Sequence, residues 1–268
     1  MSDAPLRCAV VSYLNAVPLF WGLQHGPDHE RFRLEFMLPS KCSDALRAAE
    51  VQAAILPSIE YQRIEGLKIV PGLSVSSMGP VRSVLLISKV PAGEIRTLAV
   101  DTSSRTSACL IQILLQRRYQ CSPQVIPHAP QITAMLRECD AGLMIGDPAL
   151  SSSFTDLRVY DLADEWRAMT GLPFVFAFWA VRTEAASGDL AAPFQRSAEY
   201  ALQHLEEIKQ SESHRTGLPV SLIHDYLTKN IDFSLGEKSL EGLRTFYRLA
   251  HEMGFTEEVK PLEFVGGS

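Results

Sequence analysis

Polar residues interrupt the apolar segments of this sequence at six places, and these breaks hold the side chains best suited to chemistry. The breaks are Ser12-Tyr13-Leu14-Asn15, Pro57-Ser58, Gly79-Pro80-Val81-Arg82-Ser83, Ser103-Ser104-Arg105-Thr106-Ser107, Gly146-Asp147 and Thr170-Gly171. Hydroxyl, amide and guanidinium groups bind anions, and a carboxylate such as that of Asp147 can accept a proton. Taken singly, each break is better explained as a turn or a helix cap, and Ser104 is an adequate N-cap. Together they predict one ligand site only if the strands of an α/β sheet bring them to a common edge.

The segments between the breaks alternate between strand-like and helix-like patterns. Strands are predicted over residues 7–12, 33–38, 53–56, 83–88, 97–100 and 141–145. A helix capped by Ser43 is expected to run to Glu50, and another is expected over residues 106–119, where apolar residues recur at helical spacing. The last third predicts amphipathic helices over residues 189–210, 219–230 and 236–253, the final one ended by Gly254. This alternation predicts an α/β protein with mainly parallel sheets.

Composition and charge narrow the possible function classes. The 268 residues, 46% of them hydrophobic and 21% charged, can bury a substantial core in one large or two smaller domains. The net charge of -6 disfavours nucleic-acid binding, so an anionic ligand needs local donors. The scattered Cys8, Cys42, Cys109, Cys121 and Cys139 favour reduced thiols and a cytoplasmic location. Neither a signal peptide nor a membrane span is recognised, so secretion and membrane insertion are not expected.

Several sharper motifs are absent from the sequence. It has neither a G-x-G-x-x-G after a strand nor a G-x-x-x-x-G-K-[ST], so a nucleotide site has no support. The segment Gly72-Leu73-Ser74-Val75-Ser76 lacks the last glycine of a nucleophile elbow. No H-E-x-x-H occurs, and Gly26 and Pro27 separate His25 from His29, so no metal site is expected.

An ordered set of segments runs through most of the chain, from about Val10 to Arg182. The segments are SYLNAVPLFWGL, ILPSIEY, GLSVSSMGPVRSVLLISKVP, DTSSRTSACLIQILL, GLMIGDPAL and EWRAMTGLPFVFAFWAVR. In this order they resemble one enzyme family, the chorismate dehydratases of the futalosine route to menaquinone. The sister enzyme, 1,4-dihydroxy-6-naphthoate synthase, shares the fold but typically opens with a Cys-Pro-Asn-Asp type segment. Tyr13-Leu14-Asn15 in this chain favours the dehydratase.

The resemblance implies the fold of type II periplasmic binding proteins, in which two α/β lobes are joined by two crossing strands around a central cleft. One lobe is expected to comprise residues 1–88 and 180–268, and the other residues 89–179. The crossings are expected near SVLLIS and VFAFWAV. The opening polar stretch is then expected to face the cleft from the first lobe, and Ser104 to Ser107 from the second.

The implied reaction is the loss of water from chorismate to give 3-[(1-carboxyvinyl)oxy]benzoate, without a metal or an organic cofactor. The start of the helix near Thr106, with the hydroxyls of Ser104 and Ser107 and the charges of Arg82 and Arg105, is expected to hold substrate carboxylates. Asn15 is expected to hold the substrate's hydroxyl or ring carboxylate. The proton acceptor is either Asp147 or the enolpyruvyl carboxylate of the substrate. The further expected substrate contacts are Ser12, Tyr13, Ser58, Ser83, Thr170 and Gly171.

Two other functions remain open at this point. One is a solute-binding protein that uses the same fold without catalysis, and the other is the sister naphthoate-forming enzyme. Consumption of chorismate with formation of an aromatic product distinguishes the dehydratase from both. The expected partner is therefore the small molecule chorismate, with no nucleic acid and no membrane, and the protein is expected to be a monomer or a homodimer.

Overall fold

The computed structural model describes residues 4–101, 103–186 and 188–266, and the chain divides into two compact units. Unit 1 comprises the described parts of Met1–Ser76, Val175–Gly236 and Lys260–Ser268. Unit 2 comprises the described parts of Ser77–Phe174 and Glu237–Val259. The chain therefore passes from one unit to the other at four points: after Ser76, Phe174, Gly236 and Val259.

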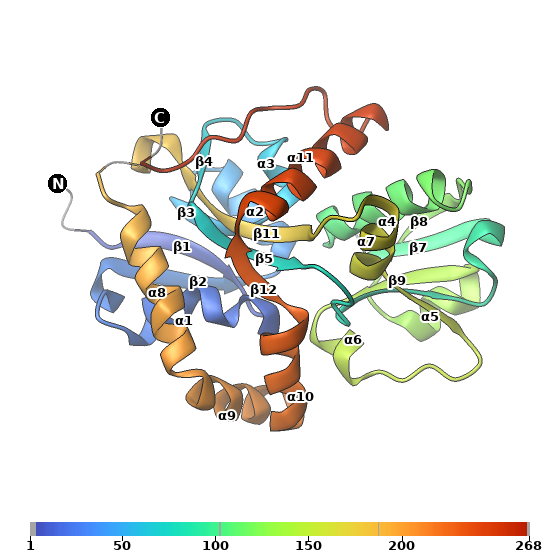
Figure 1. Cartoon of the computed structure of the whole chain (residues 1–268), viewed down its shortest axis with the longest axis horizontal. Coiled ribbons are helices and arrows are strands. Elements are labelled where there is room, and N and C mark those ends of the chain that lie inside the picture. The colour runs from blue at the N-terminus through green and yellow to red at the C-terminus, as the bar shows by residue number, and fades with distance from the viewer. Residues whose placement is uncertain (1–3, 102, 187, 267–268) are drawn as a thin grey trace. The chain divides into compact units, whose positions relative to one another are not determined.

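The sheet of unit 1 has the strand order β12-β5-β11-β3-β1-β2, with β4 also paired to β11 (Figure 1). Strand β1 pairs in parallel with β2 and β3, whereas β11 runs antiparallel to β3. Residues 8–11 of β1 are all buried, which is typical of a strand covered on both faces. The strands are β1 (Leu6–Val11), β2 (Phe32–Met37), β3 (Ala53–Pro57), β4 (Leu67–Ile69), β5 (Gly72–Ser77), β11 (Phe174–Arg182) and β12 (Asp232–Leu235).

Two helices of unit 1, α1 (Val17–His25) and α8 (Ala191–Gln203), pack closely because a glycine lies at their contact. A Cβ added to Gly22 of α1 would lie 2.5 Å from the Cα of Ser197 in α8, and the Leu23 N–H donates to the Ser197 hydroxyl at 3.0 Å. The helices are α1 (Val17–His25), α2 (Pro39–Arg47), α3 (Ser58–Tyr61), α8 (Ala191–Gln203), α9 (Leu205–Thr216) and α10 (Val220–Asp225). Shorter turns are the 3-10 helices Leu14–Ala16, His29–Arg31 and Thr183–Ala185 and the π-helical turn Tyr226–Asn230.

The sheet of unit 2 has the strand order β10-β6-β9-β7-β8 (Figure 1). Strand β7 pairs in parallel with β8 and β9, and β6 runs antiparallel to both β9 and β10. The strands are β6 (Val84–Ser88), β7 (Thr97–Asp101), β8 (Gln124–His128), β9 (Ala141–Ile145) and β10 (Arg158–Asp161). The helices are the 3-10 turn Ala92–Glu94, α4 (Arg105–Arg117), α5 (Ile132–Glu138), α6 (Asp147–Ser151), α7 (Leu162–Thr170) and α11 (Glu237–Glu252).

An aromatic cluster fixes the late helix α11 in unit 2. The ring of Phe246 packs edge-on against Trp166 and Phe174, with centroid distances of 6.3 and 4.9 Å. The indole of Trp166 donates to the Pro173 carbonyl at 3.1 Å. These contacts are the physical reason that residues 237–259 belong to unit 2, whereas the predicted division assigned all of 180–268 to the first lobe.

The structure confirms the six strands predicted from apolar runs, to within one residue at either end, and corrects other predictions. Both sheets are mixed rather than mainly parallel, since β6 and β11 run antiparallel to their neighbours. Ser43 lies inside α2, where its hydroxyl donates to the Pro39 carbonyl at 3.2 Å, so it does not cap that helix. The predicted helix over 189–210 is broken at His204, and the one over 219–230 ends in a π-helical turn. Strands β6 and β11 each belong to one sheet. The first passage between units falls within β5, after Ser76, and the second falls after Phe174, the first residue of β11.

Candidate active site

Predicted site residues of unit 1 lie at the carboxyl ends of its parallel strands. Ser12, Tyr13 and Asn15 follow β1, and Ser58 follows the parallel neighbour β3. The amino end of β11 reaches the same edge, because Ala177 pairs with Pro57. There the buried hydroxyl of Ser58 donates to the Val175 carbonyl at 2.8 Å. The structure thus brings these residues to one edge of the unit 1 sheet.

The turn that carries Asn15 is anchored by its neighbours. Leu14 and Ala16 are buried in the core, and the Ala16 N–H donates to the Tyr13 carbonyl at 3.0 Å. Pro18 then lies in the first turn of α1, where its missing N–H leaves no helical bond unmade. Asn15 itself is half-buried, and its amide makes no hydrogen bond with the residues that the structure describes. Its side chain is therefore held in place by the backbone while its hydrogen-bonding capacity remains available.

Predicted site residues of unit 2 share the equivalent edge of the second sheet. Strands β7 and β9 end there in parallel, and the antiparallel strand β6 begins there. The Gly146 N–H donates to the Ser83 carbonyl at 2.8 Å, which ties the start of β6 to the end of β9. Arg82, Ser83 and Asp147 therefore lie at the edge from which α4 begins.

The beginning of α4 has an unusual N-cap residue. The Ser104 carbonyl accepts the Ala108 N–H at 2.9 Å, but its side chain makes no capping hydrogen bond. Its hydroxyl oxygen is buried and has no hydrogen-bond partner among the described residues. Thr106 and Ser107 are also buried here, and Arg105 is half-buried. A helix amino terminus attracts anions, and a buried polar atom without a partner needs an explanation, so this place suits an anionic ligand group.

Two carboxylates at this edge were missed by the sequence analysis. Asp161, at the end of β10, accepts hydrogen bonds from the backbone N–H groups of Val81 and Arg82 and also caps α7. Burial raises the pKa of its carboxyl group, and those backbone donors act in the opposite direction. Asp101, at the end of β7, is buried and accepts both the N–H, at 2.9 Å, and the hydroxyl of Ser103. An acidic residue just before a helix signals an N-cap, but the bonds to the distant Val81–Arg82 segment leave no trace in the sequence.

The other predicted residues of unit 2 have local roles in ending helices or turning the chain. Gly171 has a φ of 75° and ends α7, while the Thr170 hydroxyl donates to the Trp166 carbonyl at 2.9 Å. Since α7 begins at the sheet edge, its last residues lie roughly 13 Å further along the helix axis. Asp147 is the first residue of α6 and is half-buried, after Gly146 with a φ of 74°. The part that each of these residues plays in substrate binding remains a prediction.

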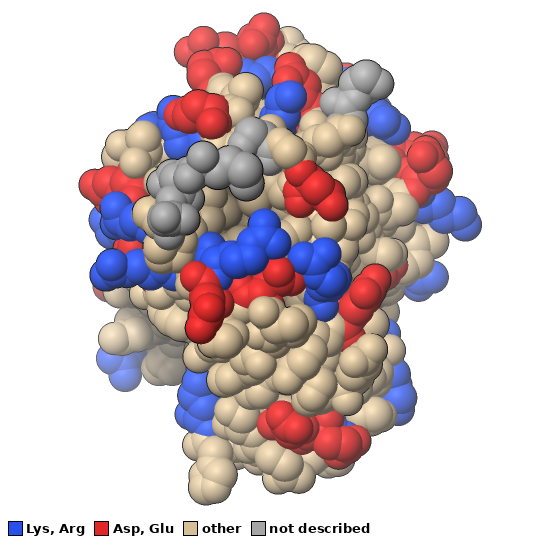
Figure 2. Space-filling model, turned by 90° about the vertical axis from the view of Figure 1, so that its left-hand side faces the viewer, with Lys and Arg blue, Asp and Glu red and all other residues tan. Residues whose placement is uncertain are grey.

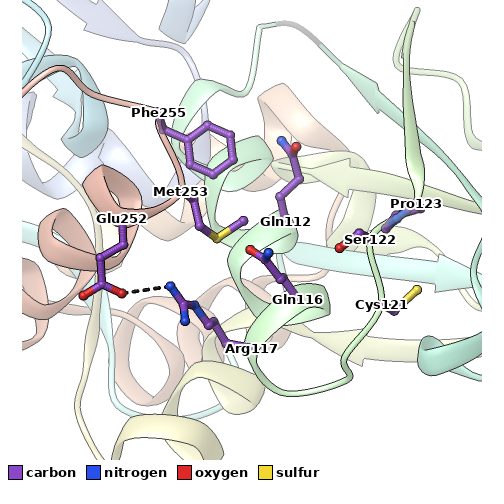
Figure 3. Close-up of a pocket in the computed structure, with 9 residues that line it drawn as sticks. All are labelled: Gln112, Gln116, Arg117, Cys121, Ser122, Pro123, Glu252, Met253 and Phe255. Atoms are coloured by element: carbon purple, nitrogen blue, oxygen red, sulfur yellow. Dashed lines mark hydrogen bonds and ion pairs between the residues drawn. The ribbon is translucent and has the colours of Figure 1, made fainter.

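A pocket of about 460 Å³ lies elsewhere in unit 2 (Figure 3). Its wall includes Gln112 and Gln116 of α4, with Met253 and Phe255 from the end of α11 and beyond. The Arg117 guanidinium pairs with the Glu252 carboxylate at 2.8 Å on one side. None of the predicted site residues lines this pocket, which is adjacent to the carboxyl end of α4 rather than its beginning. It is therefore distinct from the candidate site.

Acidic and basic side chains are interspersed on the face of the molecule in Figure 2. Among the ion pairs of the described residues, the Asp28 carboxylate contacts both Arg31 at 3.1 Å and Arg196 at 2.8 Å. The Arg196 guanidinium, followed by Arg31, lowers the pKa of the Asp28 carboxyl group. Because the net charge is -6, an anionic ligand would need local donors such as the N–H groups at the start of α4.

Comparison with solved structures identifies the fold. The chain superposes on a protein from Archaeoglobus fulgidus with a TM-score of 0.77 at 19% identity, over 95% of this chain and 100% of that one. It superposes on the periplasmic aliphatic sulphonate binding protein SsuA from Escherichia coli with a TM-score of 0.68 at 15% identity, over 100% and 96%. The protein therefore has an α/β fold of the periplasmic-binding-protein type, as predicted.

Sequence comparison identifies the family. The chain belongs to the menaquinone biosynthesis family, whose profile matches residues 6–252. It is 29% identical to the chorismate dehydratase of Thermus thermophilus, over 90% of this chain and 94% of that protein. It is 26% identical to the chorismate dehydratase of Campylobacter jejuni, over 89% and 94%. None of the helices described here combines the length and apolar character that crossing a membrane requires.

Proposed function

We propose that this protein is a chorismate dehydratase, which removes water from chorismate to form 3-[(1-carboxyvinyl)oxy]benzoate. Its family and the names of its relatives support this function. The structural observation that supports the proposal most directly is the buried hydroxyl of Ser104 at the beginning of α4, which has no hydrogen-bond partner among the described residues. We place the activity in the futalosine route to menaquinone and in the cytoplasm, where the five buried cysteines, which form no disulfide among the described residues, would remain reduced.

The proposed reaction needs positioned charge more than a reactive group. Removal of the ring proton beside the ether gives an anion conjugated with the ring carboxylate. Departure of the neighbouring hydroxyl, which takes up a proton and leaves as water, then completes the benzene ring. No electrons are gained or lost overall, and aromatisation drives the reaction. The protein must therefore mainly orient the substrate and stabilise developing carboxylate charge.

The residues at the two sheet edges fit these requirements. The amino terminus of α4, with the hydroxyls of Ser104 and Ser107, suits one carboxylate of the substrate. Arg82 supplies positive charge at the same edge of unit 2. Asn15, on unit 1, can donate to the ring carboxylate or bind the leaving hydroxyl. The proton acceptor is Asp147 or the substrate's own enolpyruvyl carboxylate, and both assignments belong to the proposal.

Ser104→Ala tests whether the buried Ser104 hydroxyl binds the substrate. If the hydroxyl binds substrate, its loss should raise the KM for chorismate by roughly tenfold or more, the usual effect of losing a hydrogen bond to a charged group. The melting temperature should stay unchanged or rise, because the variant removes a buried polar atom that has no partner among the residues that the structure describes. Steady-state kinetics and thermal melting measure the two effects.

Ser88→Ala is the matched control for this experiment. Its buried hydroxyl donates to the Val90 carbonyl at 2.7 Å at the opposite end of β6. This variant should lower the melting temperature and leave KM unchanged. A Ser104→Ala protein that melts earlier and binds chorismate normally would make Ser104 a structural residue only.

Metal independence is a second prediction of the proposed chemistry. Because loss of water is redox-neutral and driven by aromatisation, turnover should survive exhaustive chelation followed by gel filtration. The measurement is the initial rate before and after treatment, with added divalent cations as a separate arm. Loss of activity that one particular cation restores would contradict this part of the proposal.

A further inference from the structure

The carboxylate of Asp161 joins two segments that are far apart in the sequence. Its Oδ1 accepts the N–H groups of Ala163 at 3.1 Å and Asp164 at 3.3 Å, which caps α7. The same oxygen accepts the Val81 N–H at 3.0 Å, and Oδ2 accepts the Arg82 N–H at 2.6 Å. Capping a helix requires only one of these oxygens. The second oxygen, Oδ2, is therefore not needed for capping and accepts the Arg82 N–H.

Arg82 has a backbone conformation that an arginine seldom adopts. Its φ is 63°, in the left-handed region where a Cβ is disfavoured. Such a conformation persists only where the surroundings determine it fully. Val81 on one side is completely buried, and on the other side the Ser83 carbonyl accepts the Gly146 N–H at 2.8 Å. The short bond to Asp161 holds the residue between these two anchors.

This conformation leaves the Arg82 side chain exposed at the candidate site edge of unit 2. Its guanidinium makes no hydrogen bond or ion pair with the residues that the structure describes. An arginine whose backbone is fixed and whose guanidinium has no partner is suited to a planar carboxylate. We propose that Asp161 is a positioning residue, which fixes the backbone of Arg82 so that its guanidinium receives a carboxylate of the substrate. The identity of that substrate rests on the proposed function.

Asp161→Asn separates the two duties of the carboxylate. Asparagine caps helices as well as aspartate does, so its oxygen can retain the bonds to α7. Its NH₂ group would then face the Arg82 N–H as a second donor, and the bond to Arg82 is lost. We expect the KM for chorismate to rise by roughly tenfold, with kcat within about twofold of wild type, because ground state and transition state lose the same contact. A purely electrostatic role predicts the opposite, since removing a negative charge favours a dianion.

Asp164→Asn is the matched control. It removes one carboxylate from the same turn of α7, where Asp164 pairs with Arg167 at 3.0 Å, and it does not touch the Arg82 segment. Its KM should equal that of wild type. If Asp161→Asn does not fold, Asp161→Ser also keeps one capping oxygen and removes the acceptor for Arg82.

The deciding measurement is a double-mutant cycle with Arg82→Ala. If Asp161 acts through Arg82, then Asp161→Asn should change KM about tenfold alone and hardly at all in the Arg82→Ala background. Equal factors in both backgrounds, or an unchanged KM in the single variant, would overturn the inference. If the wild-type protein does not consume chorismate, the proposed function fails, and the amide proton of Arg82 decides the positioning role separately. Its downfield NMR shift and slow exchange should be lost in Asp161→Asn, and an unchanged amide would contradict the role.

Discussion

Asn15→Asp is expected to reduce chorismate turnover at limiting substrate at least as much as Asn15→Ala does. For Asn15→Ala the expected reduction is roughly ten- to a hundredfold. Loss of a hydrogen bond to a charged group accounts for the alanine effect. Aspartate keeps the size of the side chain but places a negative charge beside a dianion, so it should do at least as much harm at neutral pH. Neither variant should unfold the protein, because Leu14 and Ala16 anchor the turn and the Asn15 amide has no partner among the described residues. Measured kcat/KM values give the loss of turnover, and melting curves show whether each variant remains folded.

Gln24→Glu provides the control for charge. It makes the same amide-to-carboxylate change at an exposed position near the end of α1, the helix that follows the Asn15 turn, and should leave kcat/KM unchanged. If Asn15 only shapes the turn, aspartate should be tolerated and alanine should mainly lower stability, because aspartate is also a good turn residue. A folded Asn15→Asp protein with nearly normal dehydration would refute the substrate contact.

Gly242→Ala is expected to lower the free energy of unfolding by about 3 kcal/mol or more. A Cβ at this position of α11 would lie 2.1 Å from the Pro173 carbonyl oxygen, a backbone atom that also accepts the Trp166 indole N–H. Helix propensity alone predicts the opposite sign, because alanine is favoured over glycine by about 1 kcal/mol in a helix interior. The steric term should win, since the atom in contact belongs to the backbone and cannot turn away. Denaturant unfolding measures the change.

Gly236→Ala is the control for this substitution. Gly236 directly precedes α11, has no positive φ, and has no atom within 4 Å of an added Cβ. Its stability should stay within about 0.5 kcal/mol of wild type. Equal stability of the two variants would show that α11 does not approach Pro173 as closely as described.

The sequence predicted the strands best where a run of apolar residues is buried on both faces. Strand β3 was predicted over residues 53–56, and the structure extends it by one residue to Pro57, which was expected to end it. The break between α8 and α9 was not predicted, since no glycine or proline marks it. It occurs at His204, whose ring stacks on Tyr200 at 3.8 Å and whose Nδ1 contacts the Tyr200 carbonyl at 2.8 Å. The apolar spacing continues from α8 into α9, so the sequence pattern predicted one helix where the structure has two.

Placement of α11 shows a second limit of sequence patterns. Its periodicity indicates that one face is buried but does not say which partner covers that face. The partners are Trp166 and Phe174, more than seventy residues earlier, and they assign the helix to unit 2. Amphipathic spacing is the same whichever sheet the helix covers.

The candidate site was predictable in part for a related reason. Polar residues at strand ends are visible in the sequence, and parallel pairing brings the ends of β1 and β3 together. Asp161 was not predicted, because its role depends on the antiparallel register of β10 with β6, in which Asp161 pairs with Leu85. That register places the carboxylate beside Val81 and Arg82. A pairing between residues so distant in the chain cannot be inferred from local patterns.

The central claim is that this protein removes water from chorismate, and one assay tests it directly. Purified protein is incubated with chorismate alone, the products are separated and their masses are measured by mass spectrometry, and a sample of chorismate without protein is the negative control. The proposed function predicts that chorismate disappears and that an aromatic product appears with the mass of chorismate less one water. The account would be contradicted if fully folded wild-type protein left chorismate intact. Consumption of a cyclic futalosine derivative instead would indicate the sister enzyme, and no change in either compound would indicate a binding protein.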